Sequence, residues 1–278
     1  MQTTSKNFKV SGRGLDPLLL EVFASVDKLL DNPAFTSLMT VKCDHEKVLS
    51  VFKQKNITVF VVKPAQFNRE HAPFFSTLHD WEMDDSAGFF DHRIDDQAIF
   101  INQEYFQGDL GNAQRMFAWV TLVHETNHLL HFHLKIPSPV TALPPPLNTA
   151  EFGSAWEHQN LGGLMWFGFE ERDRKTPVAL FLQMVSEDGA AIVERYIRPD
   201  EVTKFCDITM DPAQWINGGH LPVQLRLFPA NHATNGVRKW SAYHKCCQAL
   251  DVAPSTPPSV PAFKLIMSQP VRDRRPPR

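Results

Sequence analysis

His124-Glu125-Thr126-Asn127-His128 is the stretch of sequence that most constrains the fold and the chemistry of this chain. Positions i and i+4 of an α-helix lie one above the other, so His124 and His128 can offer two imidazole nitrogens to one metal ion. Glu125 lies about 100° around the helix from His124, where it can hydrogen-bond a water held by that metal. Two His ligands and a Glu general base are typical of zinc hydrolases. The motif therefore predicts a Zn²⁺ site with Glu125 as the catalytic residue.

The residues around the motif predict one long helix over 113–134. This range contains no Gly or Pro, while Asp109, Gly111 and Asn112 offer capping chemistry before it and Pro137 follows it. The apolar positions recur at helical spacing, as a buried active-site helix requires: Met116, Trp119, Val120, Val123, Leu130 and Leu134. The alternative is an ordinary helix whose histidines are only half-buried.

A catalytic zinc site needs a third protein ligand and an open position for water. Glu151 is the preferred ligand, because it follows His128 by 23 residues, beyond a proline-rich loop that lets the chain turn back. Gly153 and Ser154 beside it would allow two helices to approach closely. Glu157 is the rival ligand, but six positions correspond to about 240° around a helix, so the two carboxylates cannot face one metal. Glu157 is interpreted as a partner of a ligand or, in preference, as a surface charge.

The segment Glu151-Phe152-Gly153-Ser154-Ala155-Trp156-Glu157, together with Leu161-Gly162-Gly163 and the HExxH motif, carries a family resemblance. It resembles the gluzincin branch of the zincin metallopeptidases, where a Glu on a second helix follows HExxH, and a pattern that recurs in fungal HExxH proteins. The resemblance covers residues 97–163. It implies that a strand predicted over 97–103 is the sheet edge that pairs with extended peptide substrate. The alternative is an internal strand without substrate contact.

The predicted fold class is α+β and zincin-like, with a small mixed sheet over the HExxH helix and a mainly helical lobe after it. Three parts are expected: an N-terminal lobe over 1–136, a helical lobe with the third ligand over 137–252, and a Pro-rich charged tail over 253–278. Hydrophobic spacing and β-branched residues predict the remaining elements, which are helices over 15–31, 177–196 and 237–250 and a buried strand over 56–62. An acidic stretch over 79–96 is expected to be a solvated loop, with calcium binding as the alternative.

Composition excludes several classes of function. A net charge of −3 gives no electrostatic case for nucleic acid or an acidic membrane, and no run of apolar residues is long enough to span a bilayer. The N-terminal residues lack the pattern of a secretory signal, so a cytoplasmic location is expected. The four cysteines, Cys43, Cys206, Cys246 and Cys247, are too sparse for a disulfide framework and fit a reducing compartment.

The predicted function is zinc-dependent hydrolysis of a peptide bond. His124, His128 and Glu151 would hold the zinc, and His131 on the same face would lie too far along the helix to join them. An oxyanion donor is also needed, and the sequence leaves four candidates open: Tyr196, His220, Tyr243 and His244. Two alternatives remain: a zinc-dependent tailoring enzyme acting on a small amide, lactone or peptide natural product, and a non-catalytic binding protein. The expected partner is a peptide or small amide; the oligomeric state stays open.

Overall fold

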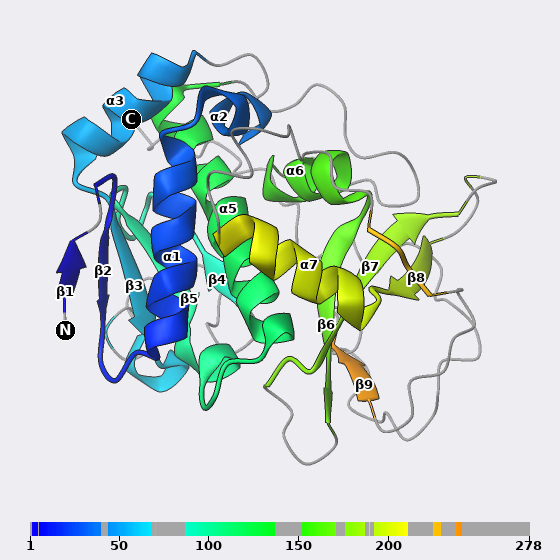
Figure 1. Ribbon diagram of the computed structural model, residues 1–278. Coiled ribbons are helices and arrows are strands. Elements are labelled where there is room, and N and C mark those ends of the chain that lie inside the picture. Colours follow the sequence, from blue (N-terminus) through cyan, green and yellow to red (C-terminus); the bar gives the residue numbers. More distant parts are fainter. Residues whose placement is uncertain are drawn as a thin grey trace, which may run out of the picture.

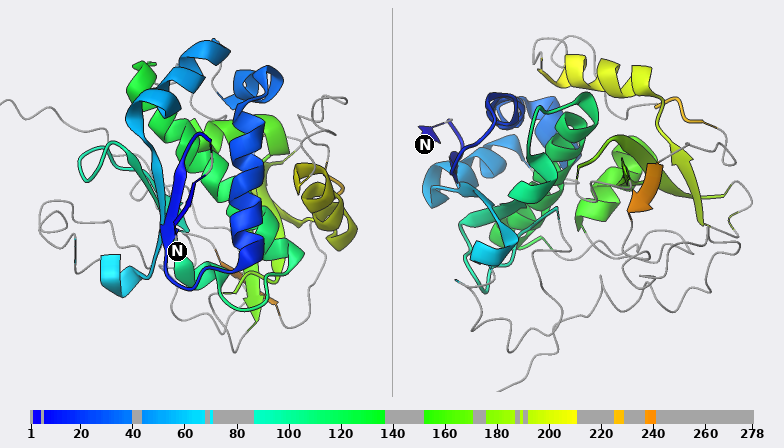
Figure 2. Two further views of the ribbon diagram at one scale, coloured as in Figure 1. Left: turned by 60° about the vertical axis from the view of Figure 1, so that its left-hand side comes forward. Right: turned by 90° about the horizontal axis from the view of Figure 1, so that it is seen from below.

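The computed structural model describes residues 2–4, 6–39, 44–67, 70, 87–136, 152–170, 176–186, 189, 192–210, 225–228 and 237–240. These residues form a mixed structure of helices and two β-sheets, as the α+β prediction requires (Figure 1). The long helix α5, Asn112–Leu134, contacts strands of both sheets and lies between them (Figure 2). The HExxH motif is therefore carried by the central element of the fold.

The first sheet has the strand order β1-β2-β3-β5-β4. Its strands are β1 Gln2–Thr4, β2 Lys9–Gly12, β3 Thr58–Val62, β4 Gly88–Phe89 and β5 Ala98–Asn102. β2, β3 and β5 are parallel, while β1 and β4 pair antiparallel at the two ends. The strand predicted over 56–62 is confirmed as β3. The sheet is mixed and small, as expected.

The strand predicted over 97–103 is confirmed as β5, but its expected place at the sheet edge is wrong. β5 lies between β3 and β4, with Phe100 opposite Phe60 on one side and Phe89 on the other. All five residues of β5 are buried, which is typical of an internal strand covered on both faces. In the described part of the chain, the edge next to α5 is β4.

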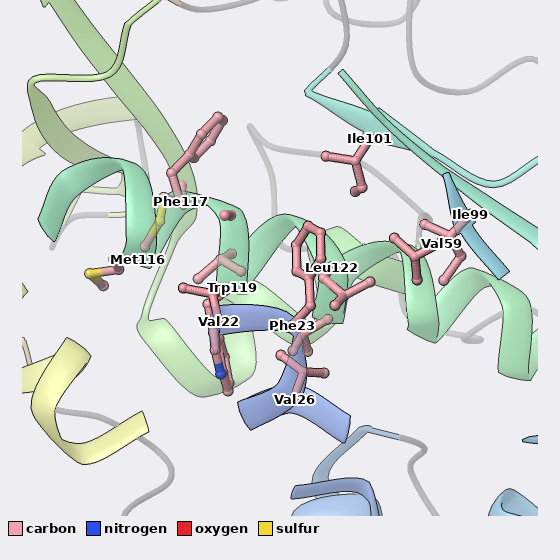
Figure 3. Packing of buried hydrophobic residues seen from close by; sticks show 14 of the residues in the cluster. Val22, Phe23, Val26, Val59, Ile99, Ile101, Met116, Phe117, Trp119 and Leu122 are labelled. Carbon is pink, nitrogen blue, oxygen red and sulfur yellow. The ribbon is translucent and has the colours of Figure 1, made fainter. Parts of the chain in front are cut away.

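Helices cover one face of this sheet. α1 Pro17–Leu30, α3 His45–Lys55 and α5 share one core cluster with this face, and α2 Pro33–Met39 packs against α1 and α3. α1 confirms the helix predicted over 15–31; it begins where the Asp16 side chain accepts a hydrogen bond from the backbone N–H of Leu18 (2.7 Å). Val22 and Phe23 of α1 pack with Ile99 of the sheet and Leu122 of α5 (Figure 3). The opposite face of the sheet carries a phenylalanine cluster: Phe60, Phe67, Phe89 and Phe100.

α5 confirms the helix predicted over 113–134. At its start the side chain of Gln114 accepts a hydrogen bond from the backbone N–H of Gly111 (3.0 Å), and at its end Lys135 turns left-handed with φ 53°. From Met116 to Leu130 every residue is buried except His124 and His128, which are half-buried. Within this range, one narrow stripe of the central helix reaches solvent, and it carries the two histidines of the motif.

The second half of the chain differs from the expected helical lobe. Its helices are α6 Phe152–Leu161 and α7 Pro199–Met210. A four-stranded antiparallel sheet, of order β8-β7-β6-β9, accompanies them. Its strands are β6 Leu164–Glu170, β7 Ala179–Val185, β8 Ile192–Tyr196 and β9 Val237–Trp240. The expectation of a mainly helical lobe is wrong for the described residues.

The helix predicted over 177–196 is wrong because this range forms β7 and β8. The apolar run Ala-Leu-Phe-Leu at the start of β7 is buried on both faces, so it shows no alternation and reads equally well as helix or strand. Gly189, at φ 72°, lies between the two strands and is the signal of a turn. The helix predicted over 237–250 is wrong for its described residues, which form β9; residues 241–250 lie outside the described part.

Other predictions meet the structure only in part. The acidic stretch expected to be a solvated loop contains β4 and, at residues 91–95, a turn in which buried Asp91 pairs with Arg93; residues 79–86 lie outside the described part. Cys206 is buried on α7, where burial raises the pKa of its thiol to about 11. Three further predictions concern residues outside the described part of the chain: Cys43, the pair Cys246 and Cys247, and the tail over 253–278. Among the described residues, none of the helices has the length and apolar character needed to span a membrane.

Candidate metal centre

His124 and His128 face the same side of α5. Their ring centroids are 5.2 Å apart and the ring planes meet at 48°. Two imidazoles bound through Nε2 to one tetrahedral zinc ion, at Zn–N distances of about 2.0–2.1 Å, have centroids roughly 5 Å apart. The spacing of the two rings therefore fits a shared metal ion.

Glu157 of α6 contacts His124 directly. Its Oε1 lies 2.5 Å from Nδ1 of His124, and its Oε2 accepts a hydrogen bond from the backbone N–H of Met165 (2.6 Å). The Glu157 side chain is 8% exposed, so the preference for a surface charge is wrong and the alternative, a partner of His124, describes its position. A carboxylate on Nδ1 holds the proton there and leaves the lone pair of His124 on Nε2.

Gly153 allows α6 to approach α5 at this point. A Cβ atom built on Gly153 would overlap the imidazole ring of His124. Gly153 and Glu157 are four positions apart, so both lie on the face of α6 that meets α5. The close approach predicted from Gly153 is confirmed, and it is what brings the Glu157 carboxylate to His124.

Phe152, the first residue of α6, lies beside His128 and His131 of α5. Its ring stacks on His131 with centroids 3.4 Å apart and meets the ring of His128 edge-on at 6.3 Å. His131 is half-buried and packs against α6. Glu151, the predicted third ligand, precedes Phe152 in the chain but lies outside the described residues.

Glu125 is buried, with 7% of its surface exposed, and is the acidic residue of the motif next to His124. The edge strand β4 runs along this part of α5. A Cβ built on Gly88 would lie 2.8 Å from Cγ2 of Thr121, one helical turn before Glu125. Further along, Phe90 packs on Phe132, one turn after His128, with ring centroids 5.9 Å apart. The sequence missed β4 because a two-residue strand leaves no periodic pattern.

The oxyanion candidates are not brought to this stripe by the described residues. Tyr196 shares a face of the second sheet with Phe181, its partner in the register. Leu180 and Leu182, on the opposite face, belong to the core cluster that includes α5. Tyr196 therefore lies on the far face of that sheet from α5. His220, Tyr243 and His244 are outside the described residues.

Comparisons with protein-family models, with curated proteins and with solved structures found no match to this chain. Within the described ranges, which omit Glu151, no group of three or more His, Cys, Asp or Glu side chains is placed to hold a metal ion. In the described part of the chain, the candidate site consists of His124, His128, Glu125 and Glu157.

We expect Glu157→Gln to weaken zinc binding by about 10–100-fold, the usual effect of losing a carboxylate that orients a ligand. The amide keeps the size of the side chain but not the negative charge that holds the proton on Nδ1 of His124. Zinc titration against a competing chelator measures the change. Glu46→Gln, the same substitution at an exposed position of α3, is the control. Equal zinc affinity in all three proteins would show that Glu157 does not act on a metal ligand.

Proposed function

We propose that this chain is a zinc metallopeptidase in which His124, His128 and Glu151 hold Zn²⁺ and Glu125 is the general base. The observation that carries the proposal is the contact between the Glu157 carboxylate and Nδ1 of His124. Metal-ligating histidines commonly donate their second ring N–H to a carboxylate, which fixes the tautomer that can bind a metal. A contact of this kind on an ordinary helix histidine would have no such use.

The surroundings of the two histidines support the same proposal. Burying a carboxylate such as Glu157 is costly unless it is paired and hydrogen-bonded. Glu157 is paired with Nδ1 of His124 and accepts a hydrogen bond from the backbone N–H of Met165, so its burial is compensated. His124 and His128 are also the half-buried positions of a helix that is otherwise buried from Met116 to Leu130. A ligand or water from solvent would reach α5 at these two side chains.

Glu151 remains the proposed third ligand. Glu157 is engaged with the nitrogen of His124 that faces away from a metal bound at Nε2, so Glu157 cannot bind that metal without leaving Nδ1. Phe152, next in the chain to Glu151, contacts the ring of His128. This contact supports the assignment of the missing carboxylate to the chain just before α6.

The proposed chemistry follows from the roles of the residues. A zinc ion held there would act as a Lewis acid and lower the pKa of a coordinated water toward about 7. Glu125 would accept the proton of the attacking water and deliver it to the leaving amine. Glu157 would hold the His124 ring in one tautomer and orientation throughout.

β4 replaces β5 as the proposed binding edge for an extended peptide. Asn102 donates its backbone N–H to the carbonyl of Ala87 (2.8 Å), and Gly88 is the next residue along β4, opposite Ile101. Hydrogen-bonded and non-hydrogen-bonded pairs alternate in an antiparallel ladder, so the N–H and C=O of Gly88 point away from β5. A peptide backbone could pair with them beside Glu125.

Removal of zinc tests this function. We expect zinc-loaded protein to cleave members of a mixed peptide library, to lose that activity after dialysis against a chelator, and to regain it when zinc is added. Glu125→Gln protein, prepared in parallel, controls for contaminating peptidases. Hydrolysis that survives metal removal would contradict the proposal. Zinc-dependent hydrolysis of small amides or lactones without any peptide cleavage would favour the tailoring enzyme instead.

A further inference from the structure

We propose that Phe90, His92 and Phe132 form a binding subsite for an aromatic or large apolar side chain of the substrate. We call these three residues the aromatic shelf. The inference rests on the proposed function, because it gives the shelf a substrate that lies along β4. It adds the chemical class of side chain that the site would select.

The shelf presents an aromatic surface to solvent close to the motif. Phe132 is 39% exposed and, with Leu18 and Val178, is one of three exposed large hydrophobic residues in the described part of the chain. The ring of His92, also exposed, stacks on Phe132 with centroids 4.4 Å apart and planes at 17°. Phe90 is 8% exposed and packs against the ring of Phe132, with centroids 5.9 Å apart. Exposed apolar surface costs free energy in water, and a bound apolar side chain would remove that cost.

The turn that carries His92 is held in place by hydrogen bonds. The buried carboxylate of Asp91 accepts hydrogen bonds from the backbone N–H and the guanidinium of Arg93 (2.9 Å and 2.8 Å), and its carbonyl accepts one from the N–H of Ile94 (3.0 Å). On α5, Nε2 of His133 contacts the carbonyl of Asp96 (2.6 Å). The two elements of the shelf are thus fixed to each other before any ligand binds, which lowers the entropy cost of binding.

The position of the shelf relative to β4 gives it a place in the proposed peptide site. Phe132 follows His128 by one helical turn, roughly 6 Å along the axis. Gly88 of β4 and Phe90, which follows β4 directly, both contact α5, at Thr121 and at Phe132. Alternate side chains of a peptide paired with β4 would point toward α5, and one of them would reach Phe132 and His92.

The test uses zinc-loaded protein, ¹⁵N-histidine labelling and two neutral probes, N-acetylphenylalanine amide and N-acetylalanine amide. We expect the phenylalanine probe to shift the His92 imidazole signal, which is assigned by its loss in His92→Gln, and the alanine probe to leave it unchanged. We also expect Phe132→Ala to weaken binding of the phenylalanine probe by about 10-fold, the size of one lost aromatic contact with its buried area. Leu18→Ala, which truncates a similarly exposed apolar residue on α1 (36%, against 39% for Phe132), should have no effect.

The outcomes separate the shelf from the proposed function. An unmoved His92 signal, or unchanged affinity in Phe132→Ala, would overturn the shelf even in a protein that cleaves peptides in a zinc-dependent way. A shifted signal that Phe132→Ala abolishes would support the shelf even if no peptide were cleaved. If Phe132→Ala fails to fold, His92→Ala removes the other exposed ring from a surface turn and provides the same comparison.

Discussion

Glu125→Gln protein is expected to bind zinc as the wild-type chain does and to hydrolyse peptides about 10²–10⁴-fold more slowly, the usual effect of losing a general base. Gln matches Glu in size and helix propensity, so the burial of position 125 and the packing of α5 are kept. An amide cannot accept the proton of the attacking water, so only the chemical step is lost. Zinc content, the thermal unfolding midpoint and peptide turnover are measured for both proteins, and turnover is the one expected to differ.

The same substitution distinguishes a catalyst from a structural side chain. If Glu125 only packed or capped the helix, Gln would change turnover little. Equal kcat/KM in the two proteins would mean that Glu125 is not the base. Loss of zinc together with activity would instead make Glu125 part of the metal site.

Gly153→Ala is expected to destabilise the fold by about 1–3 kcal/mol, the usual cost of forcing an extra methyl group into a packed contact. The added Cβ would overlap the His124 ring, so α6 or the imidazole must move. Because His124 carries the contact to Glu157, zinc affinity should fall together with stability. Urea unfolding and zinc titration give the two numbers.

Gly111→Ala is the matched control for that experiment. Gly111 precedes α5, has an ordinary φ of −75°, and a Cβ built there meets no atom within 4 Å. Its substitution adds the same methyl group without a clash, so it should leave zinc affinity unchanged. Wild-type stability and zinc affinity in Gly153→Ala would show that α6 does not press on His124 as the structure describes.

The sequence predicted the central helix and its motif well because the signals there are local. A range without Gly or Pro, a capping segment and apolar spacing define α5, whose described bounds differ from the predicted range by one residue. The prediction of Glu157 as a surface charge was wrong, although the sequence contains the spacing that places it correctly. Gly153 was used to predict a close helix contact, but Glu157, four positions on, must share the face of Gly153. The contact with His124 follows from that spacing.

The errors in the second half and at the sheet edge have a different cause. β7 and β5 are apolar on both faces, so their local pattern does not report strand order or even strand identity. β4 is only two residues long, and its pairing with β5 depends on tertiary contacts such as Gly88 against Thr121. Non-local pairing of this kind is not encoded in a window of sequence.

Metal analysis of the purified chain, beside Glu151→Ala, tests the proposed zinc centre most directly. Wild-type protein purified and dialysed in zinc-containing buffer should carry one zinc per chain by mass spectrometry of the metal. Glu151→Ala should fold but lose most of that zinc, because only His124 and His128 would remain as protein ligands. A folded wild-type chain without zinc would contradict the zinc centre altogether, and a Glu151→Ala protein with full zinc would contradict the third ligand.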